Sequence, residues 1–298
     1  MKQPEALIAD TVSHLNVFDR EYLRHGELAL AATIYQPQGD GPFPMLLTVH
    51  GGAWNAGSRT ELDLISRELA AAGMVVAAVD FRLAPDHPYP AQVQDVNYAC
   101  RWLKLHASEF NGDAVTVGVL GSSSGGHTSL LCAMRPRDPR YSAVGLDAPG
   151  EIDASFSFAI TCWGVIDPWA RLVFSQTTPE AGRGYGGPEV KVRQTFNYFI
   201  EEAAIHEGNP QEILERGEAQ ELPPLLIIQG TEDMNIPLTL PQRFAPAYRA
   251  AGGTVRVEWF PGQPHGFAYR PGPDTDRAIS VMKEFVAAAR AASSPLIA

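Results

Sequence analysis

The feature that most constrains the fold is an alternation of short apolar runs with longer amphipathic stretches along most of the 298 residues. Several of the apolar runs are hydrophobic at every position and rich in β-branched residues. This pattern is typical of strands that helices cover on both faces. The candidate strands are residues 28–35, 45–50, 75–80, 115–120, 157–163, 225–230 and 255–260.

Amphipathic patterns of helical period lie between these runs. The candidate helices are residues 59–73, 91–107, 123–135, 238–252 and 274–292. Strands that alternate with helices predict an α/β fold with a mostly parallel, doubly wound sheet. In such sheets ligands bind beyond the carboxyl ends of the strands, so the residues that follow each strand are the ones to inspect for a site.

The stretch from about residue 167 to about residue 223 breaks this rhythm. It is rich in aromatic residues, glycine and charge, and it is too long for a plain connection between elements. We expect a single domain over residues 1–298, with cap elements at about 1–27 and 167–223 that pack over the edge of the sheet.

The composition narrows the functional class. Hydrophobic residues make up 45% and charged residues 19%, as in soluble globular proteins. The formal net charge is −11 and no cluster of Lys and Arg is visible, which argues against nucleic acid and against an anionic membrane surface as partners. No apolar run is long enough to span a bilayer, and no signal peptide is visible at the N-terminus.

The cysteines favour a reducing compartment. Cys100, Cys132 and Cys162 are odd in number, far apart and set in apolar stretches, as buried thiols are. We therefore expect a cytoplasmic protein without a disulfide framework. The chain has no H-E-x-x-H pattern and no Cys/His cluster, so we expect neither a catalytic metal nor another cofactor.

The strongest chemical signal is the sequence GSSSG at Gly121–Gly125, between a candidate strand and a candidate helix. It fits G-x-S-x-G, in which the central residue occupies a strained turn from strand to helix. Residues two positions to either side approach so closely that a side chain would clash, and only Ser123 has glycine at both. The sequence predicts Ser123 as a nucleophile, and the alternative is a plain glycine–serine loop.

A second glycine-rich turn, HGGAWNAGS at residues 50–58, follows the candidate strand 45–50. Hydrolysis through a tetrahedral intermediate needs backbone N–H donors aimed at the developing oxyanion. We expect an oxyanion hole formed by the N–H groups of Gly52, Ala53 and Ser124, with Gly51 needed for the turn. An ordinary glycine turn is the alternative.

A nucleophilic serine needs a base and an acid that orients the base. His265 lies in a Pro/Gly loop after the last candidate strand, and Glu232 and Asp233 follow the strand before it. The order Ser, acid, His is the one this architecture uses. We expect His265 as the base, but periodicity alone does not separate the neighbouring carboxylates Glu232 and Asp233.

Together these segments resemble the α/β-hydrolase superfamily, and more narrowly the hormone-sensitive-lipase-like (type IV) carboxylesterases, a group that includes feruloyl and acetyl esterases. HGGAW is similar to the family's HGGG-[FW], and VDFRLAPDHPYPAQVQDV at 79–96 to D-Y-R-L-A-P-E-x-x-[FY]-P-A-x-x-x-D. GSSSGGH resembles G-D-S-A-G-G, GTEDMNIP resembles the acid loop, and PHGF matches the base loop.

The resemblance covers about residues 28–287. It implies a sheet of about eight strands flanked by helices, and it selects Asp233 over Glu232, so that Ser123, Asp233 and His265 form the triad. The sequence departs from the family at Ser122, where Asp or Glu is usual, and at Ser124 and Ala53. The cap sequence between residues 167 and 223 also departs from the family pattern.

The resemblance implies a serine esterase. The short cap favours small, short-acyl esters, and aromatic residues near the strand ends favour apolar or aromatic groups. Aromatic residues after the strand ends and in the cap are expected to line the pocket, with core packing as the alternative for each. The candidates are Trp54, Trp163, Trp169, Phe174, Tyr198 and Phe199. An amidase such as a kynurenine-formamidase-like enzyme would use the same triad, and a non-catalytic small-molecule receptor is a further alternative. A homodimer paired through the last strand and final helix is also expected.

Overall fold

The structure is a computed structural model that describes residues 15–293. Eight strands form one sheet in the order β1-β2-β4-β3-β5-β6-β7-β8. Strand β2 pairs antiparallel with β1 and β4, and all other pairs are parallel. The strands are β1 (Leu15–His25), β2 (Leu28–Pro37), β3 (Phe43–Val49), β4 (Val75–Val79), β5 (Gly112–Ser122), β6 (Phe158–Cys162), β7 (Leu225–Gly230) and β8 (Val255–Phe260).

All seven strands expected from the apolar runs are present, and the mostly parallel sheet is confirmed. The expected cap element at residues 1–27 is wrong for residues 15–25, which form strand β1 at the edge of the sheet. The sequence hides this strand because only Tyr22 and Leu23 are buried in it, so it has no apolar run. Residues 1–14 of that expected element lie outside the described residues.

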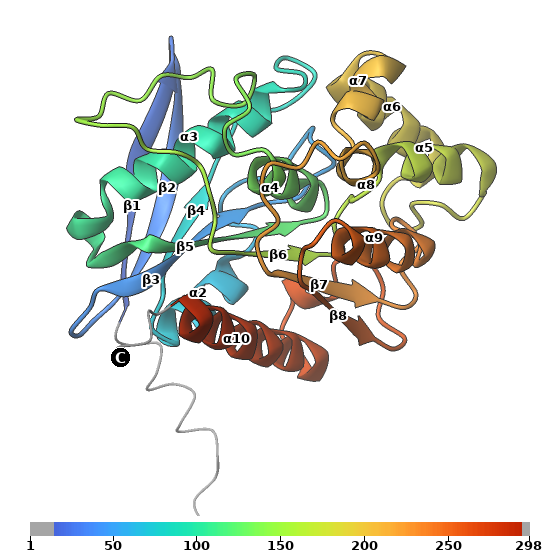
Figure 1. Ribbon diagram of the computed structural model, residues 1–298. Helices are drawn as coiled ribbons and strands as arrows, with labels where there is room; N and C mark the ends of the chain where they lie inside the picture. The colour runs from blue at the N-terminus through green and yellow to red at the C-terminus, as the bar shows by residue number, and fades with distance from the viewer. Residues whose placement is uncertain (1–14, 294–298) are drawn as a thin grey trace, which may run out of the picture.

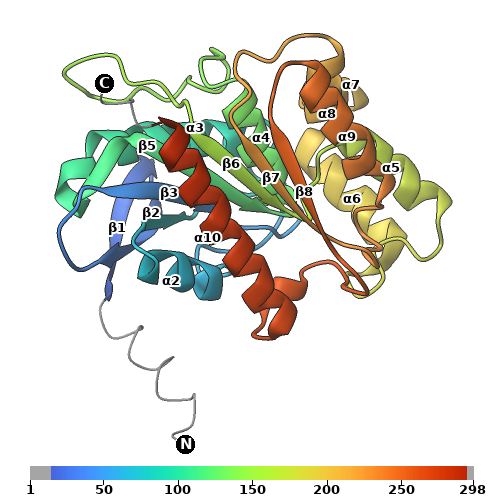
Figure 2. The same ribbon diagram turned by 60° about the horizontal axis from the view of Figure 1, so that its bottom comes forward.

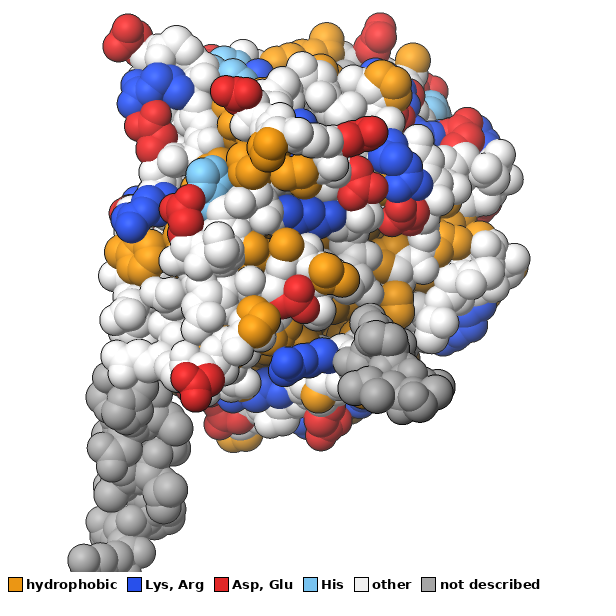
Figure 3. All heavy atoms as spheres, turned by 60° about the vertical axis from the view of Figure 1, so that its left-hand side comes forward, with side chains coloured by type: hydrophobic (Ala, Val, Ile, Leu, Met, Phe, Trp, Pro, Cys, Tyr) orange, Lys and Arg blue, Asp and Glu red, His pale blue; other side chains and the backbone are white. Residues whose placement is uncertain are grey.

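Charged side chains cover the β1 edge. Figure 3 shows Lys and Arg side chains interspersed with Asp and Glu on the face that this edge forms. Arg24 pairs with Glu21 at 2.6 Å, and Arg59 pairs with Asp19 at 2.7 Å. Charge on an edge strand opposes pairing with another chain, because a neighbouring strand would have to desolvate it.

Helices cover both faces of the sheet (Figures 1 and 2). One apolar cluster joins the sheet to α3 (Ala91–Leu105), α4 (Ser124–Met134) and α9 (Thr239–Ala250), and a second joins it to α2 (Asp63–Ala71) and α10 (Pro273–Ser293). Successive residues of β3 alternate between the clusters: Met45 and Leu47 belong to the first and Leu46 to the second. The alternation explains why the strand is apolar throughout.

The segment between β6 and β7 holds four helices, which we call the cap segment. They lie beyond the carboxyl ends of β6, β7 and β8 and alongside α4 (Figure 1). These helices are α5 (Pro168–Thr177), α6 (Gly187–Phe199), α7 (Glu202–Glu207) and α8 (Pro210–Glu215).

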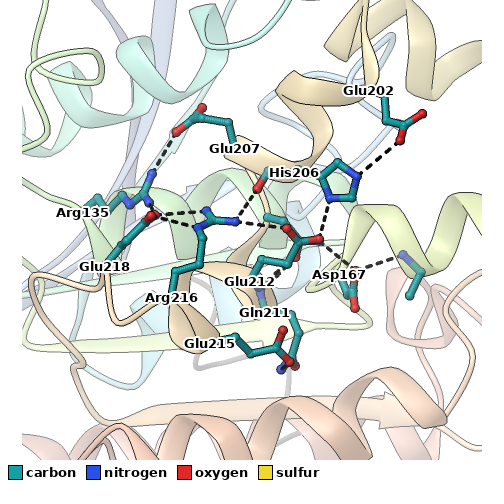
Figure 4. Close-up of polar contacts among 12 residues, drawn as sticks. Arg135, Asp167, Glu202, His206, Glu207, Gln211, Glu212, Glu215, Arg216 and Glu218 are labelled. Carbon is teal, nitrogen blue, oxygen red and sulfur yellow. Dashed lines mark hydrogen bonds and ion pairs between the residues drawn. The ribbon is translucent and has the colours of Figure 1, made fainter.

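Ion pairs tie the cap segment to the body of the protein (Figure 4). Arg135, which follows α4, pairs with Glu207 of α7 at 2.9 Å and also with Glu218. Within the cap segment, Arg216 pairs with the same Glu218 at 2.9 Å and with Glu212 at 3.1 Å, which holds Glu218 in place. Arg135 is 4% exposed, so removal of its carboxylate partners would leave a buried charge unpaired.

Candidate active site

The carboxyl ends of β3, β5, β7 and β8 lie along one edge of the sheet, and each is followed by a segment that the sequence singled out. The structure brings Ser123, Asp233 and His265 together there, although the three lie far apart in the chain. Each side chain is nearly buried, with exposed fractions of 6%, 4% and 6%.

Ser123 occupies a strained turn between β5 and α4, with φ of 50° and ψ of −118°. A Cβ atom on Gly121 would lie 2.3 Å from the carbonyl oxygen of Gly125. One on Gly125 would lie 2.2 Å from the carbonyl oxygen of His50. Because these neighbours are backbone atoms, a side chain at either position would push α4 away from the sheet, as the two flanking glycines led us to expect.

The three side chains form a continuous hydrogen-bonded row. His265 Nδ1 lies 2.8 Å from Asp233 Oδ2, and His265 Nε2 lies 3.0 Å from Ser123 Oγ. A carboxylate only accepts hydrogen bonds, so Nδ1 carries the proton and Nε2 is free to accept from the Ser123 hydroxyl. In this tautomer the ring can act as a base toward Ser123.

The structure separates the two neighbouring carboxylates. Asp233 Oδ1 accepts hydrogen bonds from the N–H groups of Asn235 and Ile236, each at 2.8 Å. Its Oδ2 accepts from Gln229 Nε2 at 3.0 Å as well as from His265. Glu232 is exposed and only its backbone reaches the loop, with its N–H 3.0 Å from the Gln263 carbonyl oxygen. Asp233 is therefore the carboxylate in the row.

The turn after β3 lies against the strained turn at Ser123, which we call the nucleophile elbow. The Gly51 N–H donates to Glu61 Oε2 at 2.7 Å, and the Trp54 N–H donates to Ser124 Oγ at 3.1 Å. Within residues 15–293, the N–H groups of Gly52, Ala53 and Ser124 donate no hydrogen bond. Gly52 and Ala53 border the cavity at Ser123, and Ser124 directly follows Ser123. Gly51 instead helps to hold the turn in shape.

The departures from the family pattern have local explanations. Ser122 Oγ accepts from the Tyr269 hydroxyl at 3.0 Å, so it holds one wall of the cavity. Ser124 Oγ joins the elbow to the turn after β3. Ala53 adopts φ of 51° where glycine is usual, a left-handed conformation that costs an L-residue about 1–2 kcal/mol.

A cavity of about 230 Å³ opens at Ser123. Most of its lining residues are of polar or charged type, and sequence reasoning missed most of them. Besides Ser123, His265, Gly52 and Ala53, the lining residues are Ala56, Glu61, Tyr185, Lys191, Gln194, Asn235 and Tyr269. Burial raises the pKa of Glu61 and lowers that of Lys191 to about 8.

The expectation that six aromatic residues line this cavity is wrong, because none of them borders it. Trp54, Tyr198 and Phe199 pack with one another in the core, with the Trp54 and Tyr198 rings stacked at 5.0 Å between centroids. Trp163 is buried behind His265 and Tyr269.

The other two expected residues lie in the cap segment. Trp169 packs on His206 at 4.6 Å and lines a different cavity, and Phe174 is half-buried in α5. The aromatic content of the cap segment thus reflects packing, the alternative reading of these residues.

Two further histidines beside the site are uncharged parts of the scaffold. Burial lowers the pKa of both His50 and His127 to about 4. The His50 ring stacks on Phe81 at 4.2 Å, and His127 Nδ1 accepts from Trp54 Nε1 at 3.2 Å.

The described residues 15–293 contain neither a metal-binding cluster nor a membrane-spanning helix. No set of three or more His, Cys, Asp or Glu side chains in this range is arranged to hold a metal ion. None of its helices is long and apolar enough to cross a membrane. The three cysteines are buried and free.

Comparison with known proteins places the chain in a family. The family model described as BD-FAE matches residues 33–247. Esterase LipC of Mycobacterium tuberculosis is 33% identical over 258 residues, which are 84% of this chain and 60% of LipC. Carboxylic ester hydrolase LipN of the same organism is 28% identical over 80% of this chain and 61% of LipN. The chain therefore spans about three-fifths of the length of these relatives.

Solved structures show the same fold. A thermophilic esterase from Thermogutta terrifontis, bound to propionate, superposes with a TM-score of 0.70 at 24% identity, covering 93% of this chain and 94% of that one. The hyperthermophilic esterase of Pyrobaculum calidifontis gives a TM-score of 0.73 at 22% identity over 94% and 88% of the two chains. The chain therefore belongs to the BD-FAE family, with the α/β-hydrolase fold and the hormone-sensitive-lipase-like motifs that its sequence indicated.

Proposed function

We propose that the protein is a serine carboxylesterase that cleaves esters of small substrates through an acyl-enzyme intermediate. The observation that carries this proposal is the row in which Ser123 Oγ lies 3.0 Å from His265 Nε2 and His265 Nδ1 lies 2.8 Å from Asp233. The esterase names of the mycobacterial relatives support the same reaction class.

In the first half-reaction, Ser123 Oγ attacks the ester carbonyl carbon while His265 Nε2 takes the hydroxyl proton. The carbonyl oxygen becomes an oxyanion in a tetrahedral intermediate. Collapse of that intermediate breaks the bond to the alkoxy oxygen, which leaves as an alcohol after His265 returns the proton to it. Asp233 holds the imidazole orientation and stabilises its cationic form.

In the second half-reaction, His265 removes a proton from water, and the resulting hydroxide attacks the acyl-enzyme carbonyl. The second tetrahedral intermediate expels Ser123 Oγ, which recovers its proton from His265, and the carboxylic acid leaves. The protein is returned to its starting state without any other reactant.

The unused N–H groups of Gly52, Ala53 and Ser124 are the proposed oxyanion hole. Ala53 serves in place of glycine because the donor is its backbone, and its left-handed conformation keeps the turn open at that position. Removal of one such donor costs a hydrolase about 10²–10³ in kcat.

The size of the cavity supports small substrates. Its 230 Å³ is below the roughly 300–1,000 Å³ of pockets that hold drug-sized ligands. We propose a preference for short acyl chains. None of the six expected aromatic residues borders the cavity, so they give no support to a preference for aromatic substrates.

The test is a chain-length series of p-nitrophenyl esters with the wild type and Ser123→Ala, together with labelling by a fluorophosphonate and mass analysis of the modified peptide. We expect the highest kcat/KM at two to four acyl carbons, a label on Ser123, and neither activity nor label in the variant. Retention of most activity in Ser123→Ala would overturn the mechanism. A matched acetanilide tests the amidase alternative, which would require comparable rates on amide and ester.

A further inference from the structure

Two cations are buried together beside the cavity. Arg171 of α5 is 1% exposed and Lys191 of α6 is 3% exposed. Neither forms an ion pair with a carboxylate anywhere in the described part of the chain. The Asp233 charge favours the cationic form of Arg171, but no carboxylate does so for Lys191. A buried charge without a counter-charge is costly, usually by several kcal/mol, so Lys191 calls for an explanation beyond packing.

Lys191 is one of the residues that line the cavity. Lys191 lies on the buried face of α6 with Thr195 and Tyr198, where an apolar residue would ordinarily lie. A Cβ atom on Gly182 would be 2.9 Å from Lys191 Cγ, so the glycine makes room for the side chain. The Nζ atom donates to Gln194 Oε1 at 3.2 Å and lies 5.5 Å from the centre of the Tyr185 ring.

Arg171 acts on the cavity through Asn235. Its guanidinium donates to Asn235 Oδ1 at 2.7 Å. An arginine only donates, so the amide oxygen of Asn235 must face it, and the amide N–H₂ is left for the cavity that Asn235 lines. The same argument applies to Gln194, whose oxygen faces Lys191. The Arg171 Nε–H is buried and has no partner of its own.

The part of the cavity wall formed by Lys191, Gln194 and Asn235 therefore offers hydrogen-bond donors to a ligand. The one carboxylate lining the cavity, Glu61, accepts from the Gly51 N–H and forms no ion pair with Lys191. The depressed pKa of Lys191, about 8, arises from burial first and then from the nearby Arg171 charge. A bound anion would offset both effects.

Building on the proposed function, we propose that the substrate is a small ester that also carries a free carboxylate, held by Lys191 with the amide groups of Gln194 and Asn235. One lysine and two neutral amides match a single negative charge and its acceptor oxygens. The carboxylate and the scissile ester must be only a few bonds apart, because Lys191 and Ser123 line the same small cavity.

The test uses pairs of esters that differ in the carboxylate alone. Monoethyl succinate is compared with ethyl levulinate, which has an acetyl group in its place, and acetoxyacetate is compared with acetoxyacetone. The first pair puts the carboxylate on the acyl side and the second on the alcohol side. Rates are followed by pH-stat with the wild type, Lys191→Met, Lys191→Arg and the surface control Lys283→Met.

We expect the wild type to prefer the anionic ester at least tenfold in kcat/KM in one of the two pairs. Lys191→Met should lose that preference, Lys191→Arg should keep part of it, and Lys283→Met should match the wild type. Equal rates, or a preference for the neutral ester in both pairs, would overturn the inference. Hydrolysis of the neutral esters that depends on Ser123 would still support the proposed function, and its absence would overturn that function instead.

A second measurement needs no variant. Succinate should inhibit hydrolysis of p-nitrophenyl acetate competitively, with an inhibition constant at least tenfold lower than that of neutral succinamide. Equal inhibition by the two compounds would overturn the inference. Stronger inhibition by inorganic phosphate than by succinate would overturn the assignment of the anion as a carboxylate.

Discussion

The Tyr269 hydroxyl donates a hydrogen bond to Ser122 Oγ at 3.0 Å, which links a wall of the cavity to the residue before the proposed nucleophile. Trp163 Nε1 in turn donates to the Tyr269 oxygen at 3.4 Å. Ser122 is fully buried, so removal of either partner leaves a polar group unsatisfied.

We expect Tyr269→Phe and Ser122→Ala each to lower the free energy of unfolding by about 1–3 kcal/mol. The double variant should lose less than the sum, with a coupling of about 0.5–3 kcal/mol, because the orphaned partner is removed as well. Urea unfolding of the four proteins measures this coupling. Strictly additive losses would show that the two side chains act independently.

The two adjacent carboxylates of the acid loop give a matched pair of variants. Asp233→Asn should lower kcat by about 10⁴-fold, the loss seen when a triad acid no longer holds the histidine tautomer. Glu232→Gln should stay within about threefold of the wild type, because its side chain is exposed and surface changes away from a site have small effects. Steady-state kinetics on p-nitrophenyl acetate compares them. A larger loss of kcat in Glu232→Gln than in Asp233→Asn would show that Glu232, and not Asp233, is the acid of the triad.

Gly125 should tolerate no side chain. A Cβ atom there would lie 2.2 Å from the His50 carbonyl oxygen and 2.3 Å from that of Val49. We expect Gly125→Ala to lose more than about 4 kcal/mol of stability or to fail to fold. Gly145→Ala is the control, because no heavy atom lies within 4 Å of its added Cβ, and it should shift stability by less than about 0.5 kcal/mol. Similar urea midpoints for both variants would contradict the close approach of α4 to β3.

Acid should destabilise the protein partly through His127. Its ring accepts from Trp54 Nε1 and donates from Nε2 to the Gly208 carbonyl oxygen at 2.7 Å, so the neutral form is bound on both sides. Its pKa is about 4 in the folded protein and about 6.5 in an unfolded chain. The unfolded chain therefore binds more protons between these values, and the contribution to stability is complete above pH 6.5 and lost as the pH falls toward 4.

This contribution amounts to about 3 kcal/mol at most. Urea unfolding at half-unit steps from pH 4.5 to 7.5 gives the slope of stability against pH. His127→Gln should flatten that slope by about 1.4 kcal/mol per pH unit below pH 6. An unchanged slope would mean that His127 is already charged in the folded protein.

The features that depend on a local sequence pattern, namely most strands and the proposed nucleophile, could be predicted from the sequence. Apolar runs located seven strands, and the steric demand for glycine at Gly121 and Gly125 singled out Ser123 among three serines. The local pattern could not decide between Glu232 and Asp233, because the choice depends on which carboxylate turns toward Gln229 and His265.

Other features depend on contacts between distant segments. Strand β1 is recognisable only through its pairing with β2, since most of its side chains are exposed. The aromatic residues pointed to a pocket, but whether a ring faces a cavity or a core depends on helix packing. Lys191 could have been noticed as a charge four residues before Thr195 and seven before Tyr198 on the buried face of one helix.

Bonds between the cap segment and the site loops bear on how this protein can be recombined. The Tyr185 hydroxyl donates to the His265 carbonyl oxygen at 2.8 Å, the Gly182 N–H to that of Met234 at 2.7 Å, and Arg171 to Asn235. A chimera that imports a relative's cap should therefore carry the loops at 231–237 and 263–269 with it. A crossover inside β7 would separate the cap from the loop at 231–237, so the imported segment should run without interruption from the end of β6 to beyond residue 269.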